Sequence, residues 1–186
     1  MNYLSIKESR NRVKDFDCGN SDLNAYLKRY AYKNDKSGIG RTFVLFDNDK
    51  PVGYVTLCSA SIDFENAPNN IKLPRYPIPA IKIARLAVDK KYQNKGFGKE
   101  LLAFSLEKIA MLAEFIGVKF VVVDAKEESK SFYEHFGFIP LPTNSDRFIL
   151  PIEIVVRARG HWWWEKRHNC LSLIINIIYL FLNAFQ

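Results

Sequence analysis

Residues 93–98 read Gln-Asn-Lys-Gly-Phe-Gly and follow an apolar, strand-like run that ends at Asp89. They open an amphipathic segment that begins Lys99-Glu100-Leu101-Leu102. A strand, a glycine-bearing turn and a helix form a cradle for phosphate, because a residue without Cβ lets backbone N–H groups approach an anion. The helix adds unpaired N–H groups and the positive end of its dipole. This stretch therefore predicts a site for a phosphorylated cofactor, with positive charge from Lys95 and Lys99.

Two common phosphate-binding motifs do not fit the stretch. A P-loop needs G-x-x-x-x-G-K-[ST], whereas Glu100 follows Lys99, and the dinucleotide motif needs a third glycine where Leu101 stands. The longer string from Arg85 to Leu102 instead resembles the pyrophosphate loop of the GNAT acyltransferases, which bind acetyl-CoA. The alternative reading is an ordinary helix N-terminus after a glycine-rich turn.

A second signature lies downstream, where residues 132–138 read Phe-Tyr-Glu-His-Phe-Gly-Phe. This run resembles the Phe-Tyr-x-x-x-Gly-Phe segment of GNAT enzymes, whose tyrosine reaches the sulfur of CoA. The resemblance covers about residues 1–155 and implies Tyr133 as the general acid. It also implies that acetyl-CoA contacts the end of the preceding strand, the loop and the start of the helix: Leu86, Ala87, Val88, Gln93, Asn94, Lys95, Gly96, Phe97, Gly98 and Lys99.

The reaction of such an enzyme requires a neutral amine to attack the thioester carbonyl. A phenol with a pKa of about 10 matches a thiolate leaving group better than a carboxylic acid does. A packed helix tyrosine is the alternative for Tyr133. Asp89, Glu65 and Glu134 are candidate bases by residue type only, and an amine of low pKa needs no dedicated base. The asparagine that many GNATs carry seven residues before the tyrosine is Lys126 here.

The hydrophobic periodicity predicts an α/β protein. With the resemblance, we expect a GNAT fold with a mixed central β-sheet, helices on both faces and a splayed pair of strands that binds acetyl-CoA. Residues 61–80, with four prolines, are expected to form a shaped loop. The expected strands are Leu4–Lys7, Arg41–Phe46, Pro51–Ser59, Ile81–Val88, Val118–Asp124, Phe138-Ile139 and Arg147–Val155, and the expected helices are 21–38, 97–116 and Glu127–Phe136.

The composition is that of an ordinary globular protein of 186 residues. Three scattered cysteines predict reduced thiols in a cytoplasmic protein, and three histidines form no metal-ligand cluster, so no metal site is expected. Because Lys7, Glu8 and Arg10 interrupt the N-terminus, no secretory signal is expected there. The net charge of +7 fits CoA phosphates, nucleic acid or a solubilising surface.

The N-terminal half narrows the resemblance. Residues 16–24 read Phe-Asp-Cys-Gly-Asn-Ser-Asp-Leu-Asn, and Gly40-Arg-Thr-Phe-Val follows. This order resembles the GNAT toxins of type II toxin–antitoxin systems, which acetylate the α-amine of aminoacyl-tRNA and block translation. The resemblance implies an aminoacyl-tRNA substrate, a small ribbon-helix-helix antitoxin and a homodimer. Basic residues that could contact tRNA are Arg41, Lys82, Arg85, Lys90, Lys91 and Lys95.

Two other functions remain open at this point. One is acetylation of a small amine, an antibiotic or a protein N-terminus. The other is a non-catalytic sensor that binds acyl-CoA, against which the intact Gly96, Gly98 and Tyr133 argue.

The composition changes near the C-terminus. We expect an acetyltransferase domain over residues 1–156 and a separate tail over residues 157–186, first basic and aromatic and then apolar from Cys170 to Phe185. The apolar run is shorter than the roughly 20 residues that cross a membrane. It could contact a membrane surface, pack on protein, or be an accidental extension.

Overall fold

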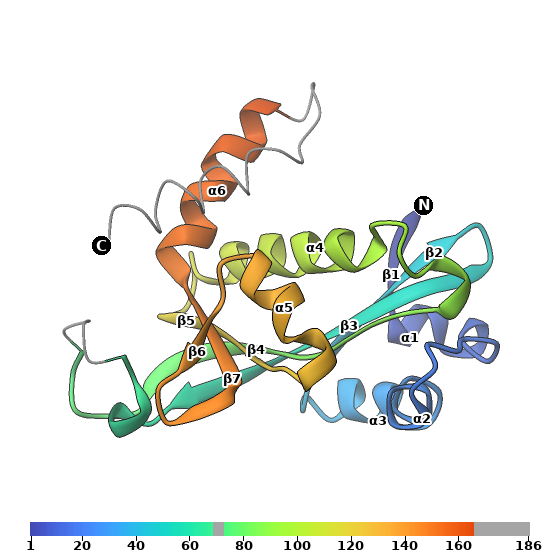
Figure 1. Ribbon diagram of the computed structural model, residues 1–186. Coiled ribbons are helices and arrows are strands. Elements are labelled where there is room, and N and C mark those ends of the chain that lie inside the picture. The colour runs from blue at the N-terminus through green and yellow to red at the C-terminus, as the bar shows by residue number, and fades with distance from the viewer. Residues whose placement is uncertain (69–72, 166–186) are drawn as a thin grey trace. The chain divides into compact units, whose positions relative to one another are not determined.

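The computed structural model describes residues 1–68 and 73–165, with side chains described to residue 158. Its contacts divide the chain into two compact units. Unit 1 is Met1–Ser59 with Ile83–Leu106, and unit 2 is Ala60–Lys82 with Glu107–Gln186. The strands form a mixed sheet in the order β1-β2-β3-β4-β5-β7-β6 (Figure 1), which confirms the predicted α/β class.

Three elements run through both units, namely β3 (Lys50–Ile62), β4 (Ile78–Val88) and α4 (Phe97–Leu112). Unit 1 also contains β1 (Asn2–Ser5), α1 (Ile6–Ser9), η1 (Arg10–Arg12), α2 (Ser21–Ala25), the π-helical turn η2 (Tyr26–Tyr30), α3 (Ala31–Lys36), β2 (Arg41–Asp47) and η4 (Lys90–Tyr92). Unit 2 also contains η3 (Phe64–Asn66), β5 (Phe120–Asp124), α5 (Glu127–His135), β6 (Ile139–Leu141), β7 (Asn144–Pro151) and α6 (Ile152–Glu165).

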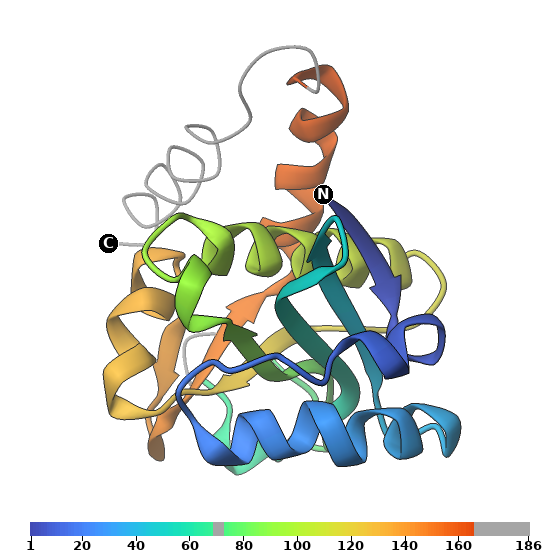
Figure 2. The same cartoon turned by 90° about the vertical axis from the view of Figure 1, so that its right-hand side faces the viewer.

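The alternation of side chains along β2 gives unit 1 two apolar faces. Val44 and Phe46 are buried among residues of α1, η2 and α3 on one face, whereas Leu45 packs with Leu101 of α4 on the other. Successive strand residues point to opposite faces, so a continuous apolar run can serve both. Figure 2 shows the N-terminal helices and α4 on opposite sides of these strands. Helices on both faces, as predicted, are therefore found in unit 1.

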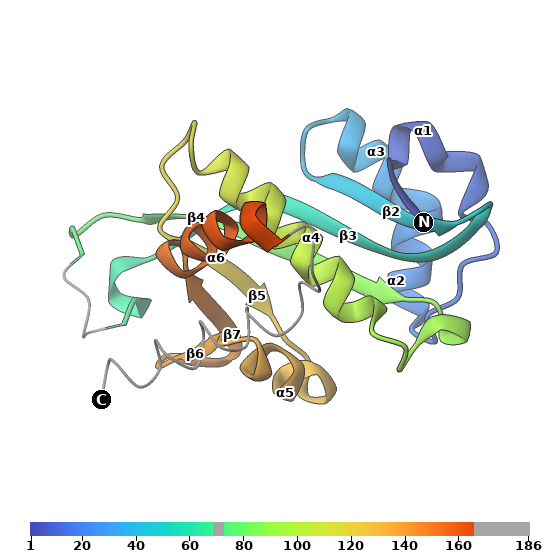
Figure 3. The same cartoon turned by 90° about the horizontal axis from the view of Figure 1, so that it is seen from above.

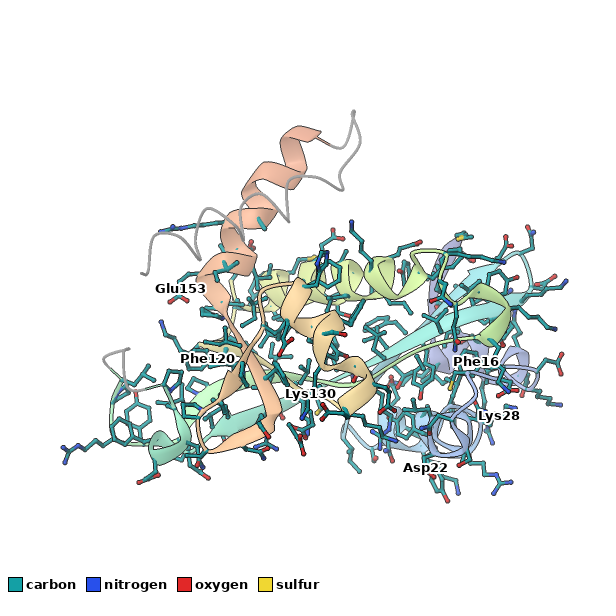
Figure 4. All side chains as sticks on the ribbon, viewed as in Figure 1. Phe16, Asp22, Lys28, Phe120, Lys130 and Glu153 are labelled. Atoms are coloured by element: carbon teal, nitrogen blue, oxygen red, sulfur yellow. The ribbon has the colours of Figure 1, made fainter. Side chains whose placement is uncertain are left out.

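The N-terminal helical segment begins where the sequence predicts. The Asn20 side chain caps it by accepting N–H bonds from Asp22 and Leu23, both at 3.1 Å. Its apolar side faces the core, while Lys28 projects outward and Phe16 lies inside the fold (Figure 4). The segment ends before Gly38, whose φ of +79° suits a helix terminus.

Two antiparallel strand pairs lie in unit 2. β7 pairs with β5 and with β6, and Val122 lies opposite Ile149 in this ladder (Figure 3). Phe120, Val122 and Ile149 belong to the buried cluster of this unit. The helix predicted over Glu127–Phe136 ends in an αL cap, because Gly137 has φ +77° and the N–H of Phe138 returns to the carbonyl of Tyr133 at 3.1 Å.

Two of the predicted strands extend over residues that form helices in the structure. The strand predicted over Leu4–Lys7 ends at Ser5, because Glu8 accepts hydrogen bonds from the Ser5 N–H at 3.0 Å and hydroxyl at 2.8 Å and so starts α1. The strand predicted over Arg147–Val155 ends at Pro151, and α6 follows. Proline suits the start of a helix, and Ile152 and Val155 then bury one helical face.

The predicted boundary at residue 156 falls inside α6, so the change in composition there coincides with no element boundary. The apolar run Cys170–Phe185 lies outside the described residues. Among the helices that the structure describes, none is both long and apolar enough to cross a membrane.

Candidate active site

The loop at residues 93–98 has the backbone expected of a phosphate cradle. β4 ends at Val88, Asp89 caps the short η4 turn, and the chain then takes positive φ at Asn94 (+59°) and Gly96 (+87°) before α4 begins. Among the described residues, and apart from Gly96 and its two chain neighbours, no atom lies within 4 Å of the position where Gly96 would carry a Cβ. An anion can therefore approach this backbone, beside the unpaired N–H groups of the first turn of α4.

Two side chains of this loop donate hydrogen bonds to backbone carbonyls of the protein. Gln93 donates two hydrogen bonds from Nε2, to the carbonyl of Val88 at 2.9 Å and to that of Cys18 at 3.0 Å. Lys95 donates from Nζ to the carbonyl of Lys91 at 2.8 Å. Gln93 thus ties the loop to the strand before it and to a segment 75 residues earlier.

Asp89 is a second junction between these segments. It is buried, with 6% of its surface exposed. Its Oδ2 accepts the N–H of Asp17 at 2.9 Å, and its Oδ1 accepts that of Lys91 at 3.0 Å. In return, the N–H of Lys90 donates to the carbonyl of Asp17 at 2.8 Å. Both oxygens of Asp89 accept backbone N–H groups, so this carboxylate has a structural role. Its residue type alone therefore no longer supports Asp89 as the catalytic base.

The Asp17 side chain is bound in turn by its own neighbours. Its Oδ1 accepts the N–H of Gly19 at 2.9 Å and the side-chain amide of Asn24 at 2.7 Å, and its Oδ2 pairs with Lys90 at 3.1 Å. These donors, chiefly Gly19, lower the pKa of the Asp17 carboxyl to about 2. Asn24 also accepts the N–H of Cys18 at 2.9 Å. The stretch Phe16–Asn24, which the sequence associated with toxins, therefore meets the candidate cofactor loop.

The predicted contacts to acetyl-CoA fall on three consecutive pieces of unit 1. Leu86, Ala87 and Val88 end β4, Gln93–Gly96 form the loop, and Phe97–Lys99 form the first turn of α4. Gly53 of β3 lies against the first piece, since a Cβ there would sit 2.8 Å from the carbonyl oxygen of Ala87 and 2.7 Å from Leu101 Cδ1. Glycine is required here for a close approach of strand and helix.

Tyr133 belongs to unit 2 and is buried in α5. Its ring meets Phe132 and Phe138 edge-on, with centroids at 5.2 and 5.5 Å. Burial raises the pKa of the Tyr133 phenol to about 12, because an apolar environment disfavours the phenolate. The side chain therefore keeps its proton and can act as a donor at any physiological pH. Glu65 and Glu134, the other candidate bases, are exposed.

Five of the six basic residues suggested for tRNA contact have partners within the protein. Arg41 pairs with Asp35, Lys82 with Asp124, and Lys90 with Asp17. The Arg85 guanidinium lies 3.7 Å from the centroid of the Tyr26 ring, and Lys95 is bound within the loop. Across residues 1–68 and 73–165, no cluster of three or more His, Cys, Asp or Glu could hold a metal ion.

Sequence reasoning missed Asp17, Cys18 and Asn24 as parts of this site. The signal was present, because all three lie in the stretch Phe16–Asn24 that was read as a mark of substrate class. Their role could not be found from the sequence, because the hydrogen bond from Asp17 to Asp89 joins residues 72 positions apart.

The chain was compared with known proteins. The model of an acetyltransferase (GNAT) domain matches residues 38–140. A tRNA-acetylating toxin of Mycobacterium tuberculosis is 35% identical over 135 residues, which are 71% of this chain and 81% of the toxin. The structure of AtaT complexed with acetyl-methionyl-tRNAfMet is similar with a TM-score of 0.75 and 25% identity, over 82% of this chain and 95% of that one.

A tyrosine-to-phenylalanine variant of the toxin AtaT, bound to the C-terminus of the antitoxin AtaR and acetyl-CoA, is also similar. The TM-score is 0.66 and the identity 26%, over 77% of this chain and 87% of that one.

Proposed function

Because this chain belongs to the GNAT acetyltransferase family, we propose that it is a toxin that transfers the acetyl group of acetyl-CoA to the α-amine of an aminoacyl-tRNA and so blocks translation. The assignment of acetyl-CoA as the acetyl donor rests on the open, left-handed turn at Gly96 beside the N-terminus of α4. The assignment of aminoacyl-tRNA as the acceptor rests on a relative that is a tRNA-acetylating toxin and on a similar structure that is complexed with acetyl-methionyl-tRNAfMet.

The donor binds through the residues that hold its phosphates and its pantetheine arm. The loop backbone at Asn94–Gly96 and the first turn of α4 provide N–H groups for the pyrophosphate. The strand end at Leu86–Val88 offers backbone groups to the pantetheine arm, in the manner of an added strand. Lys99 adds positive charge at the start of the helix.

The acetyl transfer forms one covalent bond and breaks another. The neutral amine attacks the thioester carbonyl, the new C–N bond forms, the C–S bond breaks, and the proton that the amine loses ends on the sulfur, so that the products are the amide and the thiol of CoA. Tyr133 is the group that we assign to the leaving sulfur. With a pKa of about 12, its phenol is a weaker acid than a thiol at about 8.5. It therefore stabilises the departing thiolate by donating a hydrogen bond to the sulfur and keeps its own proton.

We assign the partners and the active part of the chain on the same basis. An antitoxin that binds this chain is expected from the AtaT complex, and we propose that it is a small ribbon-helix-helix protein. We further propose that the toxin is a homodimer, that residues 1–156 carry the activity, and that the protein works in the cytoplasm, where its tRNA substrate is found. Light scattering of the purified protein, alone and with the product of an adjacent small gene, tests the first two assignments.

The acceptor is tested by offering all classes of amine together. The protein is incubated with isotopically labelled acetyl-CoA and total aminoacylated tRNA, and the aminoacyl esters are released and examined by mass spectrometry. We expect label on the α-amine of one or a few amino acids. Deacylated tRNA, polyamines and peptides with free N-termini are the controls. Label on a polyamine or peptide with none on any charged tRNA would refute the assignment of the acceptor and leave the acetyltransferase standing.

A further inference from the structure

The stretch Phe16–Asn24 makes a clamp on the candidate cofactor loop. Three hydrogen bonds join the backbone of this stretch to residues 89–93: Asp17 N–H to Asp89 Oδ2, Lys90 N–H to the Asp17 carbonyl, and Gln93 Nε2 to the Cys18 carbonyl. Their donor–acceptor distances are 2.9, 2.8 and 3.0 Å. All three use the backbone of the motif, so its conformation makes these contacts, and the Asp17 carboxylate adds a pair with Lys90 at 3.1 Å.

The clamp is itself held rigid. The Asn24 side chain bonds two adjacent residues of the turn. Its amide donates to Asp17 Oδ1 at 2.7 Å, and its oxygen accepts the N–H of Cys18 at 2.9 Å. Asn24 lies on α2, and the fully buried Phe16 ring packs edge-on against Tyr54 with centroids 5.5 Å apart. The turn is thus fixed to a helix and to the core of unit 1, which gives the loop a rigid support.

The loop needs such a support. Residues 93–96 are all exposed, and two of them take left-handed backbone angles. Ordering a loop at the moment of binding costs affinity, whereas a loop ordered in advance does not incur this cost. The contacts of Gln93 with Val88 and Cys18 fix the first residue of the loop at both sides before any ligand arrives.

We propose that Asp17, Asp89 and Gln93 are positioning residues that hold residues 93–98 in the shape that binds the pyrophosphate of acetyl-CoA, and that the Phe16–Asn24 motif therefore serves the donor rather than the choice of acceptor. This inference rests on the proposed function. It gives a role to a motif that otherwise serves only to mark a branch of the family.

Removing the charge of Asp89 distinguishes a positioning role of this carboxylate from electrostatic repulsion of the phosphate. A carboxylate near a phosphate site repels the phosphate, so replacing Asp89 by asparagine should strengthen binding if charge alone mattered. Positioning predicts the opposite sign, because asparagine has one acceptor oxygen where two N–H groups now donate. Asp15→Asn is the matched control, since it removes the same charge from an exposed position two residues before Asp17.

The test measures acetyl-CoA affinity by calorimetry for the full chain and for Asp89→Asn, Gln93→Met and Asp15→Asn. Gln93→Met keeps the length of the side chain and removes its donors without adding charge. We expect the dissociation constant to rise about tenfold in the first two variants, and to change by no more than about twofold in the control. Thermal unfolding checks each variant, and Gln93→Met, at an exposed position, carries the test if Asp89→Asn does not fold.

A second donor separates positioning from general damage. Acetyl-pantetheine lacks the pyrophosphate, so its kcat/KM with charged tRNA should be unchanged in Gln93→Met while the KM for acetyl-CoA rises and kcat stays. Equal losses with both donors, or unchanged acetyl-CoA affinity in both variants, would overturn the inference while the proposed function stands. A wild-type protein that bound no acetyl-CoA would overturn both, and it is recognised before any substitution is made.

Discussion

Gly53→Ala should destabilise the protein because β3 approaches its neighbours more closely at this glycine than a side chain allows. The added Cβ would lie 2.8 Å from the Ala87 carbonyl oxygen and 2.7 Å from Leu101 Cδ1. Leu101 is fully buried and the carbonyl belongs to a strand, so neither can move freely. Overpacking of this kind costs about 1–3 kcal/mol, and the lower entropy of the unfolded alanine chain returns about 0.4–1.

We therefore expect a net loss of about 1 kcal/mol, which corresponds to a fall in Tm of about 2–4 °C for a chain of this size. Urea unfolding followed by circular dichroism measures it. Gly117→Ala is the control, because no atom lies within 4 Å of its Cβ position, and it should be neutral or slightly stabilising. Equal stability of the two variants would show that β3 and β4 tolerate the methyl group, contrary to our reasoning. The affinity for acetyl-CoA should fall only in Gly53→Ala, since Ala87 is a predicted contact of the pantetheine arm.

Three further predictions concern the chemistry. Tyr133→Phe should lower kcat about 10²–10⁴-fold with little change in acetyl-CoA affinity, and unchanged turnover would exclude the phenol from the reaction. Gly96→Glu should abolish acetyl-CoA binding in a folded protein, because it puts a carboxylate into the cradle at φ +87°; retained affinity in calorimetry would disprove the cradle. Because burial raises the pKa of Tyr133 to about 12 from about 10 when unfolded, its contribution to stability is complete below pH 10 and is lost as the pH rises toward 12. Wild type should thus lose about 1.4 kcal/mol relative to Tyr133→Phe between pH 9 and 11 in urea unfolding, and a constant difference would contradict the raised pKa.

Short-range patterns in the sequence predicted most of the fold. The turn at residues 93–98 and the helix end at Gly137 were found because glycine has a local meaning at left-handed angles. The alternation at Val44, Leu45 and Phe46 reflects two buried faces, which an apolar run alone already indicates. Where two local signals compete, the sequence misleads: the β-branched residues after Pro151 favour a strand, yet they form α6.

The sequence predicted the residues of the candidate site that face the ligand, but not the residues that support them. Residues that face the cofactor carry a motif, because the phosphate imposes the same backbone shape on every member of a family. Residues that support them are recognised only by long-range contact. Asp89 was a candidate base by type, and only the structure places a backbone N–H at each of its oxygens. Gln93 was predicted to contact acetyl-CoA, whereas its amide donates to two protein carbonyls.

The clamp changes what counts as the smallest working piece of this chain. The GNAT model matches residues 38–140, which include the whole loop but begin after Asn24. A fragment cut to that match would retain every residue of the loop and lose the segment that supports Gln93 and Asp89. In synthesis the support is translated about 70 residues before the loop that it will hold. The region that matches the family model is therefore smaller than the region that must fold together before a cofactor can be held.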